Sequence, residues 1–154
     1  MARRVVIGVG NPDRGDDGVG RAVVYRLREC VPDDVTLLEL GGEATSLLAA
    51  IEGSALAILV DAAVSRGPPG TITRLDAHAG PVPDAPGGFS SHGLGVAQAI
   101  ELARALAALP PRCLVVAITA QAFEPGAALS PAVAAAVDPA AELVLGELRA
   151  HQRT

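Results

Sequence analysis

Two adjacent carboxylates, Asp16 and Asp17, lie in a glycine-rich turn that directly follows an apolar run at residues 5–9. The turn departs from the Gly-x-Gly-x-x-Gly pattern of a dinucleotide-binding loop, because Asp13 stands where the third glycine would be. The three aspartates of this turn would also repel a pyrophosphate. Carboxylate oxygens are instead typical ligands of divalent cations. The turn is therefore predicted to form part of a cation site.

Two further residues are expected at the same edge of the fold. Asp61 follows an apolar run at residues 56–60, and His92 opens a helix expected over residues 94–109. In an open α/β sheet, the carboxyl ends of parallel strands and the amino ends of the following helices share one rim. Two carboxylates and one imidazole at that rim suit a divalent ion such as Ni, Zn, Fe or Mn and leave coordination positions open.

Each of these residues also has a structural alternative. Asp16 is most simply the N-cap of the first helix, with Asp17 in the first turn pointing outward. Asp61 could cap a turn after its strand, and a lone histidine such as His92 is more often structural or exposed than a ligand.

A second glycine turn follows the next expected strand. Gly41 and Gly42 could form only a tight turn, but they lie on the same rim and would allow a substrate backbone to approach closely. Glu43 could be part of this surface or simply a carboxylate at a helix start. Together with Gly10 and Asn11 of the first turn, these residues are the candidate substrate-binding set.

The order of apolar segments predicts an α/β fold. Continuous apolar runs fit strands buried on both faces, and they alternate with segments of helical spacing. Strands are expected at residues 5–9, 35–40, 56–60, 71–75 and 113–119, with helices from residue 19, at 44–52, at 94–109, and at the C-terminus with a break at Asp138-Pro139.

The connections between these segments set the expected topology. The link between the third and fourth strands is too short for a crossover helix, so the fourth strand is predicted to be antiparallel to the third. The loop at residues 76–90 then returns the chain to the functional rim. The prediction is a single domain over residues 1–154, a three-layer α/β/α sandwich around a five-stranded, mostly parallel sheet with one antiparallel strand.

Composition excludes several function classes. The net charge of −5 argues against a nucleic-acid partner. All twelve basic residues are arginines, so lysine-dependent catalysis is excluded, and no Gly-x-Ser-x-Gly motif carries a serine nucleophile. No apolar stretch approaches the length of a membrane span, and a cytoplasmic monomer is expected. Cys30 and Cys113 are both predicted to be buried thiols.

Several motifs resemble those of one known family, in the family's order and across nearly the whole chain. They are Gly8-Val9-Gly10-Asn11, Asp16-Asp17-Gly18-Val19-Gly20, Val60-Asp61-Ala62, Pro69-Gly70-Thr71, Ser91-His92-Gly93-Leu94-Gly95, Glu124-Pro125 and Leu129-Ser130-Pro131. The family is that of the hydrogenase maturation proteases, endopeptidases that trim the C-terminus of the large subunit of nickel-iron hydrogenases. The resemblance implies a phosphorylase/hydrolase-like fold.

The resemblance also implies roles for individual residues. Asp17, Asp61 and His92 correspond to the family's metal-binding residues. The metal implied is the nickel already inserted in the substrate, so that cleavage would check completed metal loading. Asp16 or Asp17 is the candidate general base. The chain departs from the family at Leu40, where an acid is usual. Either Glu39 or Glu43 replaces that acid, or the chain belongs to a branch of the family with another substrate partner.

Three hypotheses follow from these observations. The leading one is a nickel-dependent endopeptidase that acts on a nickel-iron hydrogenase large-subunit precursor. The alternative is a checkpoint factor or metallochaperone that binds the immature hydrogenase without cutting it. A third, a small-molecule metallohydrolase, predicts a deep enclosed pocket, whereas the protease predicts a shallow open cleft that admits a protein tail.

Overall fold

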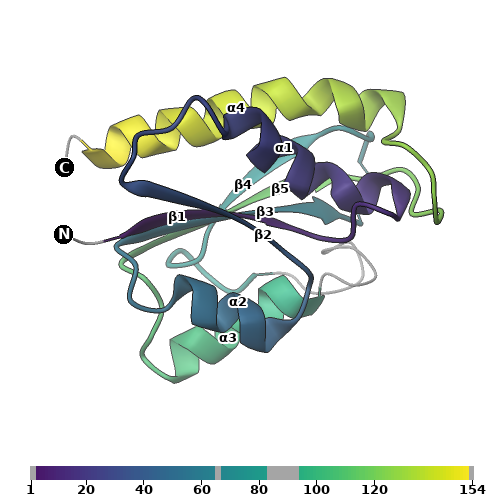
Figure 1. The fold of residues 1–154 in the computed structure, drawn as a ribbon. Coiled ribbons are helices and arrows are strands. Elements are labelled where there is room, and N and C mark those ends of the chain that lie inside the picture. Colours follow the sequence, from purple (N-terminus) through teal and green to yellow (C-terminus); the bar gives the residue numbers. More distant parts are fainter. Residues whose placement is uncertain (1–2, 65–66, 83–93, 153–154) are drawn as a thin grey trace.

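A five-stranded sheet forms the centre of the molecule, as the computed structural model shows for residues 3–64, 67–82 and 94–152 (Figure 1). The strand order is β2-β1-β3-β5-β4. The first four strands of that order run parallel, and β4 runs antiparallel to β5. The predicted sheet and its one antiparallel strand are confirmed, although β4 pairs with β5 and not with β3. The strands are β1 Arg4–Val9, β2 Val35–Leu40, β3 Leu56–Ala63, β4 Ile72–Asp76 and β5 Arg112–Thr119.

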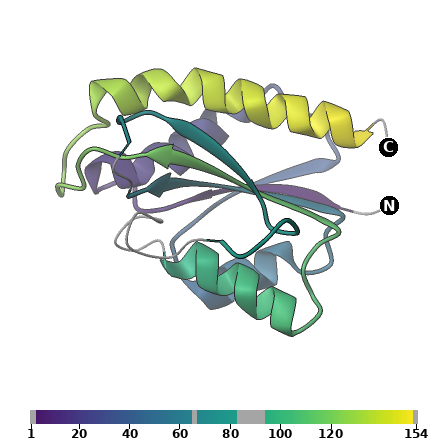
Figure 2. The ribbon, with the colours of Figure 1, turned by 180° about the vertical axis from the view of Figure 1, so that it is seen from behind.

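Helices cover both faces of the sheet and complete the predicted α/β/α sandwich. Helix α1 (Val19–Leu27) and helix α4 (Pro131–Gln152) lie on one face. Helix α2 (Ala44–Ile51) and helix α3 (Leu94–Ala105) lie on the other, and Figure 2 shows the same layers from behind. Helix α3 is shorter than the helix expected at residues 94–109.

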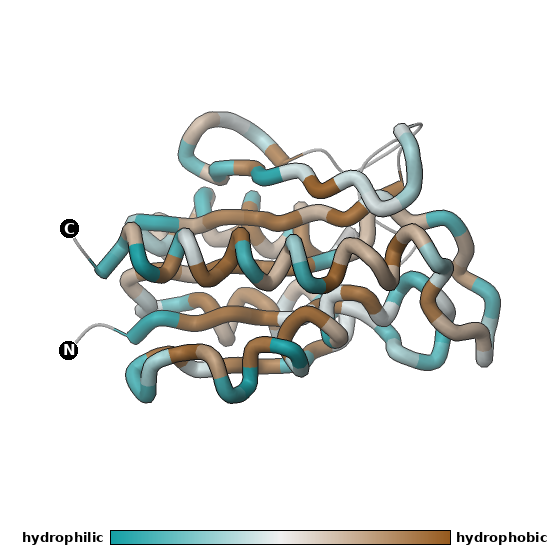
Figure 3. The backbone as a smooth tube through the Cα atoms, turned by 90° about the horizontal axis from the view of Figure 1, so that it is seen from above, coloured by the Kyte–Doolittle hydropathy of each residue, from teal (hydrophilic) through white to brown (hydrophobic). Residues whose placement is uncertain are grey.

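The buried core is divided by the sheet into two apolar layers. In β1, the side chains of Val5 and Ile7 pack toward α2 and α3, whereas the intervening Val6 packs toward α1 and α4. This alternation follows from the two-residue repeat of a strand. Figure 3 shows hydrophobic stretches along the central strands and hydrophilic residues in the outer connections. Each central strand therefore supplies apolar side chains to both layers, which explains its continuous apolar sequence.

Helix α4 continues without interruption through Pro139, so the predicted break at Asp138-Pro139 is wrong. Proline removes one helical N–H donor and normally bends or ends a helix. Here Ala136 and Ala140, on either side of it, are both buried against the sheet, whereas Pro139 itself is exposed. Packing holds the helix on both sides of the proline, and water can reach the carbonyl that has lost its donor.

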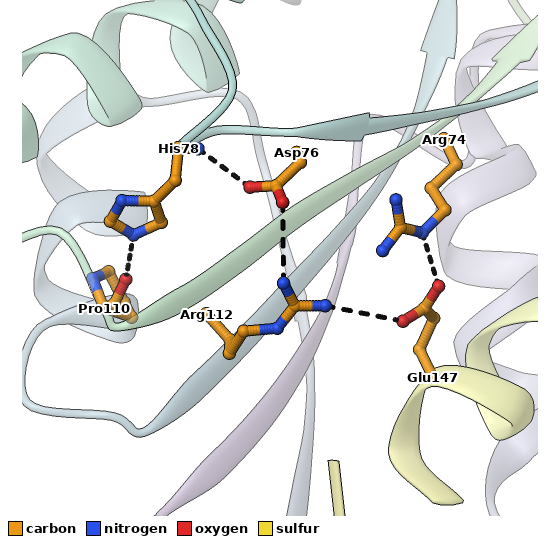
Figure 4. Close-up of polar contacts among 6 residues, drawn as sticks. All are labelled: Arg74, Asp76, His78, Pro110, Arg112 and Glu147. Atoms are coloured by element: carbon orange, nitrogen blue, oxygen red, sulfur yellow. Dashed lines mark hydrogen bonds and ion pairs between the residues drawn. The ribbon is translucent and has the colours of Figure 1, made fainter. Parts of the chain in front are cut away.

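A polar network ties the edge strand β4 to β5 and α4 (Figure 4). Arg112 of β5 donates to the carboxylate of Asp76 at 3.5 Å and pairs with Glu147 of α4 at 3.8 Å. Arg74 of β4 pairs with the same Glu147, and the N–H of His78 donates to Asp76 at 2.8 Å. Partly exposed ion pairs contribute little stability each, so the network's main effect is to hold the edge strand in place.

The two cysteines differ in their surroundings. Cys113 is buried in β5, as predicted, but Cys30 is exposed beyond the end of α1. The prediction for Cys30 is wrong because α1 ends at Leu27, one turn before the apolar repeat suggested. Within the ranges that the structure describes, no helix combines the length and the apolar character needed to cross a bilayer.

Candidate functional site

A cleft opens at the carboxyl ends of β1 and β2. The helices that follow these two strands, α1 and α2, lie on opposite faces of the sheet. The cleft is at the carboxyl ends of the parallel strands, the edge at which open α/β folds bind ligands. The cleft has a volume of about 510 Å³ and is open to solvent. Its lining residues are Gly10, Asn11, Arg14, Asp17, Arg21, Gly41, Gly42 and Glu43.

The turn after β1 has a backbone that requires glycine. Gly10 has a φ of +132°, and a Cβ atom at this position would lie 2.0 Å from the carbonyl oxygen of Asp17. The N–H of Gly10 donates to the carbonyl of Leu40 at 2.9 Å, which joins the turn to the end of β2. The chain then enters the short 3-10 helix η1 (Gly15–Gly18), which carries both aspartates. The turn thus folds back over the carboxyl end of β1.

A glycine also lets α1 lie directly against the sheet. A Cβ atom on Gly20 would lie 2.2 Å from the carbonyl oxygen of Val60 and 2.8 Å from that of Val9. No side chain fits between the start of α1 and the carboxyl ends of β1 and β3. Asp61 is the residue that follows Val60 in β3. The close approach of α1 to Val60 therefore places Asp17, in η1, near Asp61.

Asp17 and Asp61 are buried carboxylates that each have one oxygen without a hydrogen bond in the described part of the chain. Oδ2 of Asp17 accepts from the N–H of Asn11 at 2.9 Å, and Oδ1 of Asp61 accepts from the N–H of Ala62 at 2.8 Å. Oδ1 of Asp17 and Oδ2 of Asp61 remain without a donor. A buried acceptor left this way is costly and commonly marks a functional site.

Asp61 lies inside β3, which continues beyond it to Ala63, so the alternative role as a cap of a following turn is wrong. Burial, with a further contribution from the negative charge of Asp17, raises the pKa of Asp61 well above its usual value of 3.8, and the bond from Ala62 only partly opposes this. Two neighbouring carboxyl groups repel each other when both are ionised, and a cation bound between them would remove this repulsion.

Asp16 has a different role from the predicted helix cap. Neither η1 nor α1 has a side-chain cap bond. Instead, Asp16 accepts four hydrogen bonds of 2.7–3.0 Å from the backbone N–H groups of Gln121, Ala122 and Ser130 and from the Ser130 hydroxyl. Burial alone would raise the pKa of Asp16, but these bonds outweigh it and hold the pKa below 3.8. The carboxylate anchors the first turn to the segment that leads into α4.

The third predicted ligand, His92, lies outside the described residues. Within the described ranges, no group of three or more histidine, cysteine or acidic side chains could hold a metal ion. The described part of the site is therefore a carboxylate pair.

The comparisons with known proteins agree with one another. The sequence profile of the hydrogenase maturation proteases matches residues 22–147. The hydrogenase 2 maturation protease of Escherichia coli K12 is 33% identical over 154 residues, covering 96% of this chain and 91% of that protein. The chain belongs to the hydrogenase maturation protease family.

Two further similarities agree with this. The structure of the hydrogenase maturating endopeptidase HybD from Escherichia coli matches with a TM-score of 0.85 and 32% identity, over 97% of this chain and 93% of that one. The hydrogenase expression/formation protein HupD of Rhodobacter capsulatus is 30% identical, over 96% of this chain and 72% of that protein. The fold of the hydrogenase maturation proteases and their endopeptidase character thus extend to this chain, and the open cleft accords with a protein substrate.

All five candidate substrate-binding residues of this hydrogenase maturation protease line the cleft. Among the acids near the family departure at Leu40, Glu43 borders the cleft, whereas Glu39 pairs at 2.7 Å with Arg28, the residue that follows α1. Leu40 itself packs against the core layer beneath α2 and α3. Glu43 is therefore the acid that the cleft retains on its β2 side.

Sequence reasoning missed two cations of the cleft, Arg14 and Arg21. A signal for Arg21 was present, since it follows Asp17 by four residues and so shares its side of a helical turn. For Arg14, the sequence shows no comparable spacing to a candidate site residue. The missed partners of Asp16 lie more than 100 positions away in the chain and have no local signal.

Proposed function

We propose that this hydrogenase maturation protease removes the C-terminal extension of a nickel-iron hydrogenase large-subunit precursor after nickel has been inserted. The observation that carries the proposal is the pair of buried oxygens, Oδ1 of Asp17 and Oδ2 of Asp61, that lack donors among the described residues. Two such acceptors beside an open cleft fit a cation that arrives with the substrate.

The chemistry of the two carboxylates suits a divalent ion bound through oxygen. In this proposal Asp17 and Asp61 bind the precursor's nickel, and His92, which precedes Leu94 by two positions in the sequence, supplies a nitrogen ligand. The substrate's nickel would polarise the scissile carbonyl or lower the pKa of an attacking water, either of which contributes several kcal/mol of transition-state stabilisation.

Asp61 gives the site a simple form of selectivity. Its raised pKa favours the protonated carboxyl while the cleft is empty. A divalent ion that replaces this proton relieves the repulsion from Asp17, so the site favours a precursor that carries metal over one that does not. This supports a check of metal loading before cleavage.

The cleft walls can hold an extended polypeptide. Gly10, Gly41 and Gly42 keep side chains away from the floor between β1 and β2, so that the backbone of a tail can approach closely. Glu43 offers an acceptor to the backbone N–H groups of that tail. Asp16 holds the first turn and has no role in proton transfer in this proposal, since four donors occupy its oxygens.

The test is a processing reaction with purified protein and the large-subunit precursor encoded by the same genome, prepared with and without nickel. We expect mass spectrometry to show loss of a C-terminal peptide from the nickel-loaded precursor alone. Asp17→Asn, Asp61→Asn and His92→Ala are each expected to abolish processing, with circular dichroism confirming that the fold is kept.

The matched control is Asp13→Asn, which removes an exposed carboxylate from the same turn and is expected to process normally. Equal cleavage of the nickel-free precursor would overturn the requirement for nickel. Binding of the nickel-loaded precursor without cleavage would instead favour a non-cleaving checkpoint factor.

A further inference from the structure

Arg21 is connected to Asp17 through a single peptide group. Its Nε–H donates to the carbonyl oxygen of Gly10 at 2.7 Å. The N–H of the same peptide unit, which belongs to Asn11, donates to Oδ2 of Asp17 at 2.9 Å. The peptide between Gly10 and Asn11 therefore lies in a row of hydrogen bonds that begins at a guanidinium and ends at a carboxylate.

Such a row is stronger than its separate members. Hydrogen bonds with a charged donor or acceptor are shorter and stronger than neutral ones, and bonds in series polarise one another. The positive charge of Arg21 draws electron density toward the Gly10 oxygen and makes the Asn11 N–H a better donor to Asp17. The carboxylate is then held at Oδ2, while Oδ1 has no donor in the described ranges.

The backbone at this point needs such a restraint. Gly10 has a φ of +132°, a region that glycine enters freely and other residues rarely adopt. No side chain at Gly10 limits rotation of the following peptide, so its orientation depends on the groups that bind it. Among the described residues no carboxylate pairs with Arg21, and the Gly10 carbonyl is the acceptor that accounts for the placement of its Nε.

We propose that Arg21 is a positioning residue of the proteolytic site, acting on Asp17 through the Gly10–Asn11 peptide. Arg21 fixes that peptide, the Asn11 N–H fixes Oδ2 of Asp17, and Oδ1 stays available to the substrate's nickel. The inference rests on the proposed role of Asp17 as a ligand of that nickel. Because Arg21 also lines the cleft, the test must separate positioning from direct substrate binding.

The variants are Arg21→Met, which keeps much of the side-chain length without the charge, and Arg21→Lys, which keeps a charged donor. Arg28→Met is the matched control, since Arg28 directly follows the far end of α1 and pairs with Glu39 outside the cleft. The first readout is amide hydrogen exchange by NMR. In Arg21→Met the Asn11 amide should exchange about tenfold faster, as expected for a weakened charged hydrogen bond. The Gly10 amide, bound to Leu40, should keep its protection.

The second readout is the kinetics of processing with nickel-loaded precursor at varied concentration. Arg21→Met is expected to lower kcat about tenfold with KM changed less than about twofold, since misplacing a ligand affects the reacting complex more than its formation. Arg21→Lys should recover part of kcat, and Arg28→Met should match the wild type.

Unchanged exchange of the Asn11 amide in Arg21→Met overturns the proposal. So does a loss confined to KM, which would make Arg21 a substrate-binding residue. If wild-type protein fails to process the nickel-loaded precursor, the proposed function fails, but the Asn11 amide still reports on the Arg21 row independently. The two failures are therefore distinguishable.

Discussion

Asp16 and Ser130, which stand 114 positions apart in the chain, are joined by two hydrogen bonds. The backbone N–H of Ser130 donates to Oδ1 of Asp16 at 2.7 Å, and the Ser130 hydroxyl donates to Oδ2 at 2.7 Å. This contact fastens the turn that carries Asp17 to the residue just before α4. The geometry of the cleft thus depends on the C-terminal helix, although that helix contributes no lining residue within the described ranges.

Asp16→Asn should destabilise the protein while leaving its secondary structure intact. The amide can accept at one oxygen only, and its NH₂ group would face donors in place of an acceptor. We expect the free energy of unfolding to fall by roughly 2–4 kcal/mol, the scale for breaking a buried charged network. Urea unfolding followed by circular dichroism measures this. A loss of unfolding free energy below about 1 kcal/mol, close to that of an ordinary surface substitution, would contradict the assigned anchoring role.

Acid should weaken the same anchor. Because hydrogen bonds lower the pKa of Asp16 below 3.8 in the folded state, its contribution to stability is fully present above the unfolded value. It is lost as the pH falls through 3.8 toward the folded pKa. The difference in unfolding free energy between wild type and Asp16→Asn is therefore expected to narrow below about pH 4, a range set by the Asp reference pKa. A difference that stays constant from pH 7 to pH 3 would exclude this linkage.

Asp61→Asn should have the opposite effect at neutral pH. The folded pKa of Asp61 is raised, so the unfolded chain releases this proton more readily and the group costs stability. The cost is absent below the unfolded pKa and grows as the pH rises toward the folded pKa. Asp61→Asn is expected to raise the unfolding free energy at pH 7, since asparagine has no proton to release on unfolding. The gain should shrink on acidification toward pH 4, near the Asp reference value.

The measurement for Asp61→Asn is urea unfolding at both pH values, combined with the processing assay. A variant that is more stable yet inactive would identify Asp61 as a residue retained for function at the expense of stability. Equal or lower stability at pH 7 would show that burial of the Asp61 carboxyl carries no net cost.

Gly20→Ala should separate α1 from the sheet. The added Cβ would lie 2.2 Å from the carbonyl oxygen of Val60, a backbone atom that cannot move aside cheaply. We expect a loss of about 3 kcal/mol, at the upper end of the usual cost of overpacking. Gly146→Ala in α4 is the matched control, because a Cβ there meets no atom within 4 Å. Alanine also favours helix over glycine, so Gly146→Ala should gain about 0.5–1 kcal/mol. Thermal or urea unfolding of both variants tests the pair.

The two thiols should react at very different rates. Cys30 is exposed, whereas Cys113 is buried, and burial followed by the negative charge of Asp76 raises its pKa to about 12. A thiol reagent should modify Cys30 in the folded protein and reach Cys113 only after unfolding, because the thiolate is the reactive form. Mass spectrometry of a Cys30→Ser variant provides the control. Labelling of Cys113 in that folded variant would contradict its burial.

The strands were largely predictable from the sequence as short apolar runs between turns, and the central strands β1, β3 and β5 are buried on both faces. The expected strand at residues 35–40 matches β2 residue for residue. The end of β3 was not predictable, because Ala63 is held by pairing with Thr119 of β5, a residue 56 positions away. The break predicted at Pro139 was wrong for a similar reason. The burial of Ala136 and Ala140, which keeps α4 intact, depends on packing against the sheet and not on the helix's own sequence.

The site was predictable to the extent that it follows strand ends. The candidate substrate-binding residues lie directly after β1 and β2, and the structure brings them into one cleft with Asp17. The separate roles of Asp16 and Asp17 could not be predicted, since adjacent aspartates in one turn look alike until the distant donors to Asp16 are known. The role of Arg21 is likewise invisible in the sequence, because it acts through a backbone carbonyl.

The position of β5 between β3 and β4 has a consequence for synthesis of the chain on the ribosome. When β3 is synthesised, its neighbour β1 has already been made. Its other neighbour, β5, begins only at Arg112. At about 5–20 residues per second, the interval between the end of β3 at residue 63 and the end of β5 at residue 119 is roughly 3–11 s. During that interval the unpaired apolar edge of β3 in the nascent chain can pair with strands of other chains. Synthesis and pairing of β5 cover this edge and so reduce the risk of aggregation.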